Sequence, residues 1–464
     1  MSVRLTASER GVTPLHNTKI PLTFVGVLGL VVVALFTPSF VPVLPIAVLN
    51  LLAFVVLAPR LAPLALSPAV YFAAYLSAVG LLGNVFSNPL TGSGGTGGVD
   101  VLVTDDLLRG TANALLIASS LVLVSAAVTR GPNKSGNASR SAALDLGDLT
   151  RLSALILVLG VIELALLVYF LGVNALISRP DRLVGRGSSI EAAIQMAAIG
   201  AVAGVAIVLF SGRPAQRWLA FILLVGFVGY FISLGTRRLA LVPLLILLGS
   251  VFAKRGKISV LALIPTVLVS VVLLALPLYF RGLSMHGLVP HLGGLSAFVL
   301  DKSVLAASTN NVLAGFKITA MTGFSAPKID ASVLWISISP ITGGSVGWYE
   351  VAPTLRLNKF TPFSGIGELI NYGPIVFICA FTMLGGILGI MQRVNDRILA
   401  TPGAKITAIG ALGLVFIFTI QSTQYNLRSD IRYLYFAIAV QIVGLLLMRS
   451  STLKRVNGVV RGSQ

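Results

Sequence analysis

Long apolar runs separated by short polar segments constrain this chain most strongly. Of its 464 residues, 56% are hydrophobic and only 11% are charged, whereas about a quarter of the residues are charged in soluble domains. A run of about 20 apolar residues can cross a bilayer as an α-helix, because a helix satisfies its own backbone hydrogen bonds. The sequence therefore predicts an all-α integral membrane protein.

About twelve such runs are present, and they divide the chain into a bundle, a large loop and three final spans. Pro38, Pro42 and Pro45 interrupt the first two runs, which alternatively form one span with a re-entrant piece. The predicted spans cover residues 20–36, 40–58, 63–86, 107–128, 152–173, 190–210, 217–233, 239–253, 258–279, 373–391, 406–422 and 431–448. The predicted parts are a cytoplasmic tail (1–19), about nine spans (20–279), a large extracytoplasmic loop (280–372), three spans (373–448) and a second cytoplasmic tail (449–464).

The net charge of +19 follows the topology of these spans. With both termini in the cytoplasm, the short segments on that side contain most of the Lys and Arg residues and few acids, as the positive-inside rule requires. The charge therefore indicates membrane topology and not nucleic-acid binding. The single cysteine, Cys379, excludes an intramolecular disulfide and a cysteine-based zinc site.

Several arginines break this charge rule on the opposite, outer side. They are Arg179, Arg182, Arg186, Arg237, Arg238, Arg281, Arg428 and Arg432. A guanidinium group forms bidentate hydrogen bonds with phosphate and stays charged at any relevant pH. The set predicts a site for a lipid-linked phosphate or pyrophosphate, although each arginine alone could instead contact ordinary phospholipid headgroups.

The only long hydrophilic segment lies on the same side. Its residues 295–324 have the pattern of one or two amphipathic helices on the membrane surface. Residues 337–374 are rich in Gly and Pro and contain charged and aromatic side chains, namely Trp348, Tyr349, Glu350, Arg356, Lys359, Glu368 and Tyr372. We predict that this part covers a membrane-embedded site for a ligand with anionic, sugar and lipid parts, the alternative being a loop without chemistry.

Two residues are candidates for proton transfer at the outer surface. Glu368 lies just before a predicted span, among glycines that permit a tight backbone. His291 follows His286 by five residues, and either imidazole could take a proton from a hydroxyl at neutral pH. No third ligand accompanies them, so we predict no metal site. Glu163, near the middle of a span, could bind a ligand or form a structural hydrogen bond between helices.

Two short motifs resemble a known family. GTRRLALVPLL, beginning at Gly235, and TPFSGIGELINYG, beginning at Thr361, together resemble the O-antigen polymerases of the Wzy type and the related oligosaccharide repeat-unit polymerases. About twelve spans with one large outer loop before the last three agree with that pattern. The resemblance implies a GT-C-like, membrane-embedded glycosyltransferase in the bacterial cytoplasmic (inner) membrane, with its active site on the extracytoplasmic face.

The implied reaction transfers a growing glycan from undecaprenyl pyrophosphate to the next lipid-linked repeat unit, by an inverting mechanism without metal or cofactor. The pyrophosphate and glycan would contact Arg182, Arg186, Arg237, Arg238, Arg281, Arg356, Arg428, Arg432, Trp348 and Tyr349. Glu368 or His291 would be the base. A flippase and a chain-length regulator are the implied protein partners, beside the lipid-linked oligosaccharides and the bilayer.

Two alternatives remain open from the sequence. A transporter or flippase for a lipid-linked glycan would bind the same phosphate chemistry, but it is expected to have matching halves and ionisable groups deep in several spans. An O-antigen ligase-type transferase would differ in its acceptor only. The polar residues gather on one side of this chain, and that asymmetry favours the polymerase.

Overall fold

The structure is a computed structural model that describes residues 42–61, 67–86, 104–130, 149–181, 189–253, 260–299, 313–358, 361–399, 401 and 404–461. Helices make up nearly all of these residues, which confirms the all-α prediction. One short antiparallel pair, β1 (Arg356–Asn358) and β2 (Thr361–Pro362), is the exception within the described part of the chain. The first predicted span, 20–36, lies outside the described residues.

The observed helices coincide with the predicted spans. They are α2 (Val43–Leu61), α3 (Pro68–Phe86), α4 (Asp105–Arg130), α6 (Leu149–Leu171), α8 (Ser189–Ser211), α9 (Pro214–Leu234), α10 (Leu241–Ala253), α11 (Val260–Phe280), α17 (Pro374–Leu399), α18 (Lys405–Gln421) and α19 (Leu427–Arg461). Of these, α17 and α19 continue 8 and 13 residues beyond the ends predicted at 391 and 448. Six helices in the described ranges, in α3, α4, α6, α9, α17 and α19, are long and apolar enough to cross a membrane, and shorter apolar helices accompany them. These helices indicate a membrane-embedded protein.

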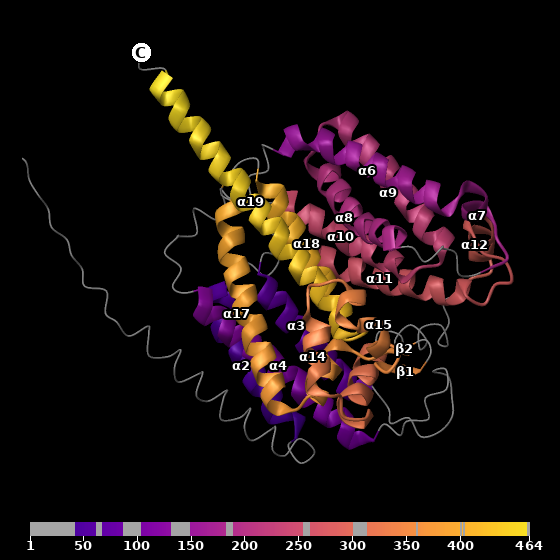
Figure 1. The fold of residues 1–464 in the computed structure, drawn as a ribbon. Coiled ribbons are helices and arrows are strands. Elements are labelled where there is room, and N and C mark those ends of the chain that lie inside the picture. The colour runs from indigo at the N-terminus through magenta and orange to yellow at the C-terminus, as the bar shows by residue number, and fades with distance from the viewer. Residues whose placement is uncertain are drawn as a thin grey trace, which may run out of the picture.

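The helices form two groups that lie side by side (Figure 1). In the first group α4 packs against α2, α3 and α17, and α18 packs against α19. In the second group α8 packs against α6, α9 and α10, and α10 packs against α11. The groups meet where α8 contacts α18, and there Ile207 of α8 shares a buried cluster with Leu412 of α18.

The helix ends that we assigned to the cytoplasmic side lie together in the first group. Arg130, at the end of α4, forms a 2.7 Å salt bridge with Asp396 of α17 and donates to the carbonyl of Leu61, the last residue of α2. At the opposite end of the same group, the Tyr75 hydroxyl lies 2.7 Å from the Thr423 hydroxyl. The packing is therefore consistent with the predicted direction of each of these spans.

The segment that we assigned to the large outer loop folds into short elements. They are α12 (Leu288–Leu295), the π-helix η3 (Met321–Ser325), α14 (Ala331–Ile338), the 3₁₀-helix η4 (Gly343–Val346), α15 (Trp348–Val351), β1, β2 and α16 (Gly365–Asn371). Residues 313–320 are also helical and lead into η3. We predicted surface helices over 295–324. The described residues 313–324 of that stretch are instead packed inside, with Phe316 fully buried against Gly83 of α3.

Close backbone packing fixes the position of α16. The Ser364 hydroxyl caps this short helix by accepting a hydrogen bond of 2.9 Å from the Gly367 N–H. A Cβ atom at Gly367 would lie 2.6 Å from Thr322 Cβ and 3.0 Å from the Thr319 carbonyl oxygen. Only glycine therefore lets α16 approach the preceding helix this closely.

Replacing Gly367 with alanine is expected to lower the free energy of unfolding by about 1–3 kcal/mol, because the added methyl group overpacks this contact. Thermal unfolding of the purified protein in detergent would measure the change. Gly413→Ala in α18 is the control, since a Cβ there meets nothing within 4 Å. Equal unfolding temperatures for the two variants would contradict the steric argument.

Candidate functional site

Glu368 lies at the contact between α16 and the start of α19. Its side chain is fully buried, and its Oε1 accepts a hydrogen bond of 3.1 Å from the backbone N–H of Leu427, the first residue of α19. A carboxyl group is favoured at a helix N-terminus, where unpaired N–H groups and the helix dipole meet it. Its Oε2 has no hydrogen-bond partner among the described residues.

A second carboxyl group, that of Asp430, is buried beside Glu368. Asp430 lies in the first turn of α19, and both of its carboxyl oxygens lack hydrogen-bond partners in the described part of the chain. A Cβ atom built on Gly365, one turn before Glu368 on α16, would lie 2.9 Å from Asp430 Oδ2. We call Glu368 and Asp430 the buried acid pair. Asp430 cannot be singled out from the sequence, because an acid in the first turn of a helix is ordinary and only burial distinguishes this one.

The surroundings of Glu368 raise the pKa of its carboxyl group toward neutral pH. Burial raises the pKa of the Glu368 carboxyl to about 8. The Leu427 N–H opposes that rise in part, as does the nearby Ser337 hydroxyl, which does not reach hydrogen-bond geometry. Burial, followed by the charge of Glu368, raises the pKa of the Tyr372 phenol. Glu368 is therefore mainly protonated at pH 7 and exchanges its proton close to the working pH, which suits general acid–base chemistry.

Arg238 approaches this region from the second helix group. It lies on η2 (Arg237–Ala240), directly after the turn at Gly235, and donates a hydrogen bond of 2.8 Å to the Gln195 carbonyl of α8. Tyr433 of α19 interacts electrostatically with both Arg238 and Asp430. Asp430 and a predicted phosphate-binding arginine thus act on one tyrosine, although they come from different helix groups.

Arg428 and Trp348 also contact each other, but the guanidinium of Arg428 binds carbonyl groups of the protein's own backbone. The Arg428 side chain is only 1% exposed and donates to the carbonyls of Ile336, Ser339 and Ile341. Its guanidinium carbon lies 5.3 Å from the centre of the Trp348 ring. We predicted that Arg428 binds ligand phosphate. In the structure its donors hold the segment between α14 and α15 against α19.

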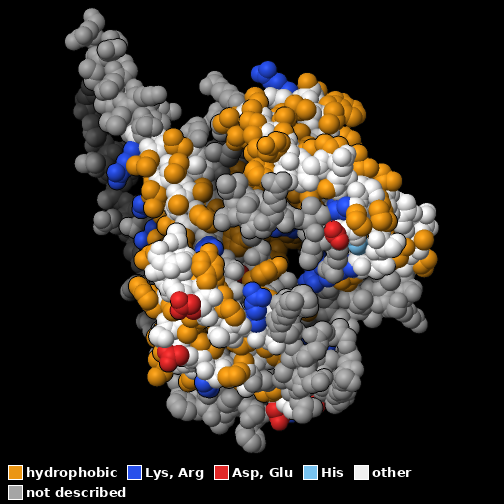
Figure 2. Space-filling model, turned by 45° about the vertical axis from the view of Figure 1, so that its right-hand side comes forward, with side chains coloured by type: hydrophobic (Ala, Val, Ile, Leu, Met, Phe, Trp, Pro, Cys, Tyr) orange, Lys and Arg blue, Asp and Glu red, His pale blue; other side chains and the backbone are white. Residues whose placement is uncertain are grey.

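The other predicted ligand residues differ in their exposure. Arg237, Tyr349, Arg356 and Arg432 are exposed, and Arg281 is half-buried at the end of α11. Arg182 and Arg186 lie outside the described residues. Figure 2 shows that the molecular surface is hollowed between the two helix groups and that Lys or Arg side chains lie along the rim.

His291, the second candidate base, lies in a different place. Its ring is 1% exposed and stacks on Phe280, with 4.3 Å between ring centres. Its Nδ1 is 2.6 Å from the Ile232 carbonyl oxygen and must donate to it, so Nε2 faces Nδ1 of His286 at 3.4 Å. Burial lowers the pKa of His291 and keeps the ring neutral. The structure therefore places the two candidate bases apart, with His291 against α9 and Glu368 against α19.

Arg179 connects the segment that contains the two histidines to the neighbouring helix ends. Its guanidinium donates to the Ser233 carbonyl at 3.0 Å, and its backbone forms an antiparallel bridge with His286. These contacts join the segment after α7 (Val173–Ile177) to α9 and to the turn before α12. Arg179 therefore stabilises the packing of these helix ends.

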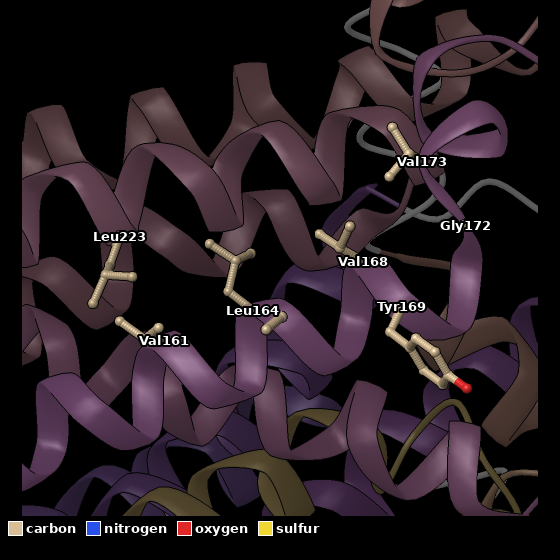
Figure 3. A pocket seen from close by; sticks show the side chains of 8 residues that line it. Val161, Leu164, Val168, Tyr169, Gly172, Val173 and Leu223 are labelled. Carbon is tan, nitrogen blue, oxygen red and sulfur yellow. The ribbon is translucent and has the colours of Figure 1, made fainter.

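A shallow apolar groove runs along α6 beside α9 (Figure 3). Its cavity volume is about 580 Å³, and Tyr169, 79% exposed, stands at one end. The lining residues are Val161, Leu164, Ala165, Val168, Tyr169, Gly172, Val173 and Leu223. An apolar groove of this size accepts part of a hydrocarbon chain.

No group of three or more His, Cys, Asp or Glu side chains that could hold a metal ion occurs in the described ranges. No protein-family profile matches the chain, and neither the curated proteins nor the solved structures contain a match. The function is therefore inferred from the site alone.

Proposed function

We propose that this protein is a GT-C-like glycosyltransferase with about twelve spans that polymerises undecaprenyl-pyrophosphate-linked repeat units on the outer face of a bacterial cytoplasmic membrane. One observation supports it most. Glu368 is a buried carboxyl with an unpartnered oxygen, and its charge acts on Asp430. Asp430 and Arg238, a cation from the other helix group, both act electrostatically on Tyr433. A transferase with a pyrophosphate leaving group needs both a base and a cation.

The reaction assigns one task to each group. The acceptor sugar hydroxyl forms a bond to the anomeric carbon of the donor glycan, and its proton passes to Glu368 Oε2. The bond from that carbon to the pyrophosphate oxygen breaks, and the electron pair leaves with the undecaprenyl pyrophosphate. The Arg238 guanidinium stabilises the charge that develops on the leaving group. A carboxyl pKa of about 8 suits a base that must later release its proton.

The apolar groove on α6 fits the lipid part of this substrate. An undecaprenyl chain is a long hydrocarbon, and the groove offers it side chains of Val, Leu and Ala in place of bilayer lipid. The groove does not select a sugar. The glycan would instead contact the exposed Tyr349 and Arg356 of the segment beside Arg428.

A transporter for a lipid-linked glycan is the second candidate function. The buried acid pair favours it, because buried carboxyls near the ends of membrane helices also carry protons or ions during transport. The two functions differ in product. A polymerase lengthens the glycan, whereas a transporter moves an unchanged molecule across the bilayer.

Chain extension by the purified protein in liposomes tests the proposal, with lipid-linked repeat units as substrate and a glycan ladder as readout. We expect Arg238→Ala to slow extension about 100-fold or more, because charge stabilisation of the leaving group is lost. Arg397→Ala is the matched control, being an exposed arginine at the far end of α17. A normal ladder from Arg238→Ala would remove the leaving-group role. Transport without lengthening by the unaltered protein would favour the transporter.

A further inference from the structure

The turn that contains Arg238 begins where α9 ends. Gly235 ends α9 in the left-handed conformation, with φ at 57°, and its N–H donates to the Ile232 carbonyl at 2.9 Å. The Thr236 hydroxyl then accepts a hydrogen bond of 3.4 Å from the Arg238 N–H at the start of η2. Leu239, the next residue, is 1% exposed and anchors η2 in the core. The position of Arg238 therefore depends on the last turn of α9, since Leu239 fixes only the residues that follow.

Side chains from two distant segments bind the last carbonyl groups of α9, which lack the usual partner one turn further along the helix. His291 of α12 donates from Nδ1 to the Ile232 carbonyl at 2.6 Å. Arg179, two residues after α7, donates from Nη2 to the Ser233 carbonyl at 3.0 Å. Its positive charge suits the negative end of the helix dipole. Backbone hydrogen bonds of 2.7 and 2.8 Å between Arg179 and His286 join the two segments, so the end of α9 is held from outside the helix.

The His291 ring has a single orientation that suits this contact. It lies parallel to the Phe280 ring, with 3° between the ring planes and 4.3 Å between the centres. In the neutral ring Nδ1 donates to the carbonyl, so Nε2 is the acceptor, and it faces Nδ1 of His286 at 3.4 Å. A Cβ atom at Gly235 would lie 3.4 Å from His291 Cε1, so the ring edge lies against the turn itself. Both ring nitrogens therefore face the protein, and neither is directed to a substrate.

We propose that His291 is a positioning residue: by holding the carbonyl end of α9, it places the Arg238 guanidinium for the pyrophosphate leaving group. This inference rests on the proposed function, in which Arg238 stabilises the charge on that group. The connection is short, because the carbonyl that binds His291 also accepts the Gly235 N–H, and Arg238 follows Gly235 by three residues. A displacement of about 1 Å can slow a reaction about 100-fold, so the last turn of α9 must stay in place for the chemistry.

A spin label at residue 237 tests the hold on the turn without any substrate. The label is attached to Arg237→Cys, an exposed position, in a full-length Cys379→Ser background in lipid bilayers, and its mobility is read from the EPR spectrum. Leucine and asparagine have nearly the same shape, but only the asparagine amide can replace the Nδ1 donor of His291. We expect His291→Leu to mobilise the label and His291→Asn to keep it ordered. Equal spectra for the two variants would overturn the role of the hydrogen bond.

A double-mutant cycle of chain extension separates positioning from a purely structural role. We expect His291→Leu to lower kcat about 10-fold with little change in KM, because the misplaced guanidinium acts mainly in the transition state. In the Arg238→Ala background the same change should cost nothing further, since the residue that it positions is already gone. Losses that multiply in the double variant would overturn the proposal and leave His291 a structural residue.

A second variant keeps the test decisive if His291→Leu does not fold. Phe280→Leu removes the ring on which His291 stacks, and it takes the place of His291→Leu in the cycle, with the same expected result. Normal extension by Arg238→Ala would count against the proposed function alone. The EPR spectra would still decide whether His291 holds the turn.

Discussion

Replacing Arg428 with alanine is expected to lower the free energy of unfolding by about 3 kcal/mol or more, and to abolish chain extension. The buried guanidinium donates to the carbonyls of Ile336, Ser339 and Ile341, and hydrogen bonds to a charged group each contribute about 1.5–3 kcal/mol. Without it, these acceptors lose their buried donors and the cation–π contact with Trp348 disappears. The segment between α14 and α15 would detach from α19.

Thermal unfolding and limited proteolysis between residues 338 and 348 would measure this effect. Arg432→Ala is a close control, since Arg432 lies one turn further along α19 but is exposed. Arg428→Lys should fail to restore stability, because an ammonium group lacks the planar fork that reaches several carbonyls at once. If Arg428→Ala were as stable as the wild type, the guanidinium would bind the ligand and would not stabilise the segment between α14 and α15.

Replacing Glu368 with glutamine is expected to slow chain extension by about 10²–10⁴-fold, the usual contribution of a positioned general base. The same change should alter the response of stability to pH. The folded state binds a proton on Glu368 up to a pKa of about 8, whereas the unfolded carboxyl releases it near its ordinary value of 4.5. Stability of the unaltered protein therefore falls as pH rises from about 5 to 8, and the glutamine variant lacks this slope.

Extension assays and unfolding at several pH values would measure both effects. Glu163→Gln is the control, because Glu163 is a half-buried acid in the middle of α6 and belongs to the other helix group. We expect it to be much less damaging. A stronger loss from Glu163→Gln would move the chemistry into the bilayer and favour transport.

Hydropathy was sufficient to predict where most of the long helices lie. The spans predicted at 107–128 and 217–233 match α4 and α9 within a few residues, because an apolar run of bilayer length has few other structures available. Glu368 was predicted as a site residue for a related reason. An acid among glycines at a membrane edge is unusual enough to be noticed in the sequence alone.

The side-chain environments could not be predicted in the same way. Arg428 and His291 were expected to face a ligand, yet both are buried and bonded to backbone carbonyls of distant segments. Asp430 was overlooked, and the helix before η3 was expected on the surface. Each of these outcomes depends on which segments meet in three dimensions, and local periodicity does not contain that information.

The bond from Leu427 to Glu368 has a mechanical consequence. It fastens the short helix α16 to the first residue of α19, a helix of 35 residues that extends for about 50 Å at 1.5 Å per residue. Because α19 also packs against α17 and α18, the whole first helix group, and not this bond alone, resists a displacement of α16.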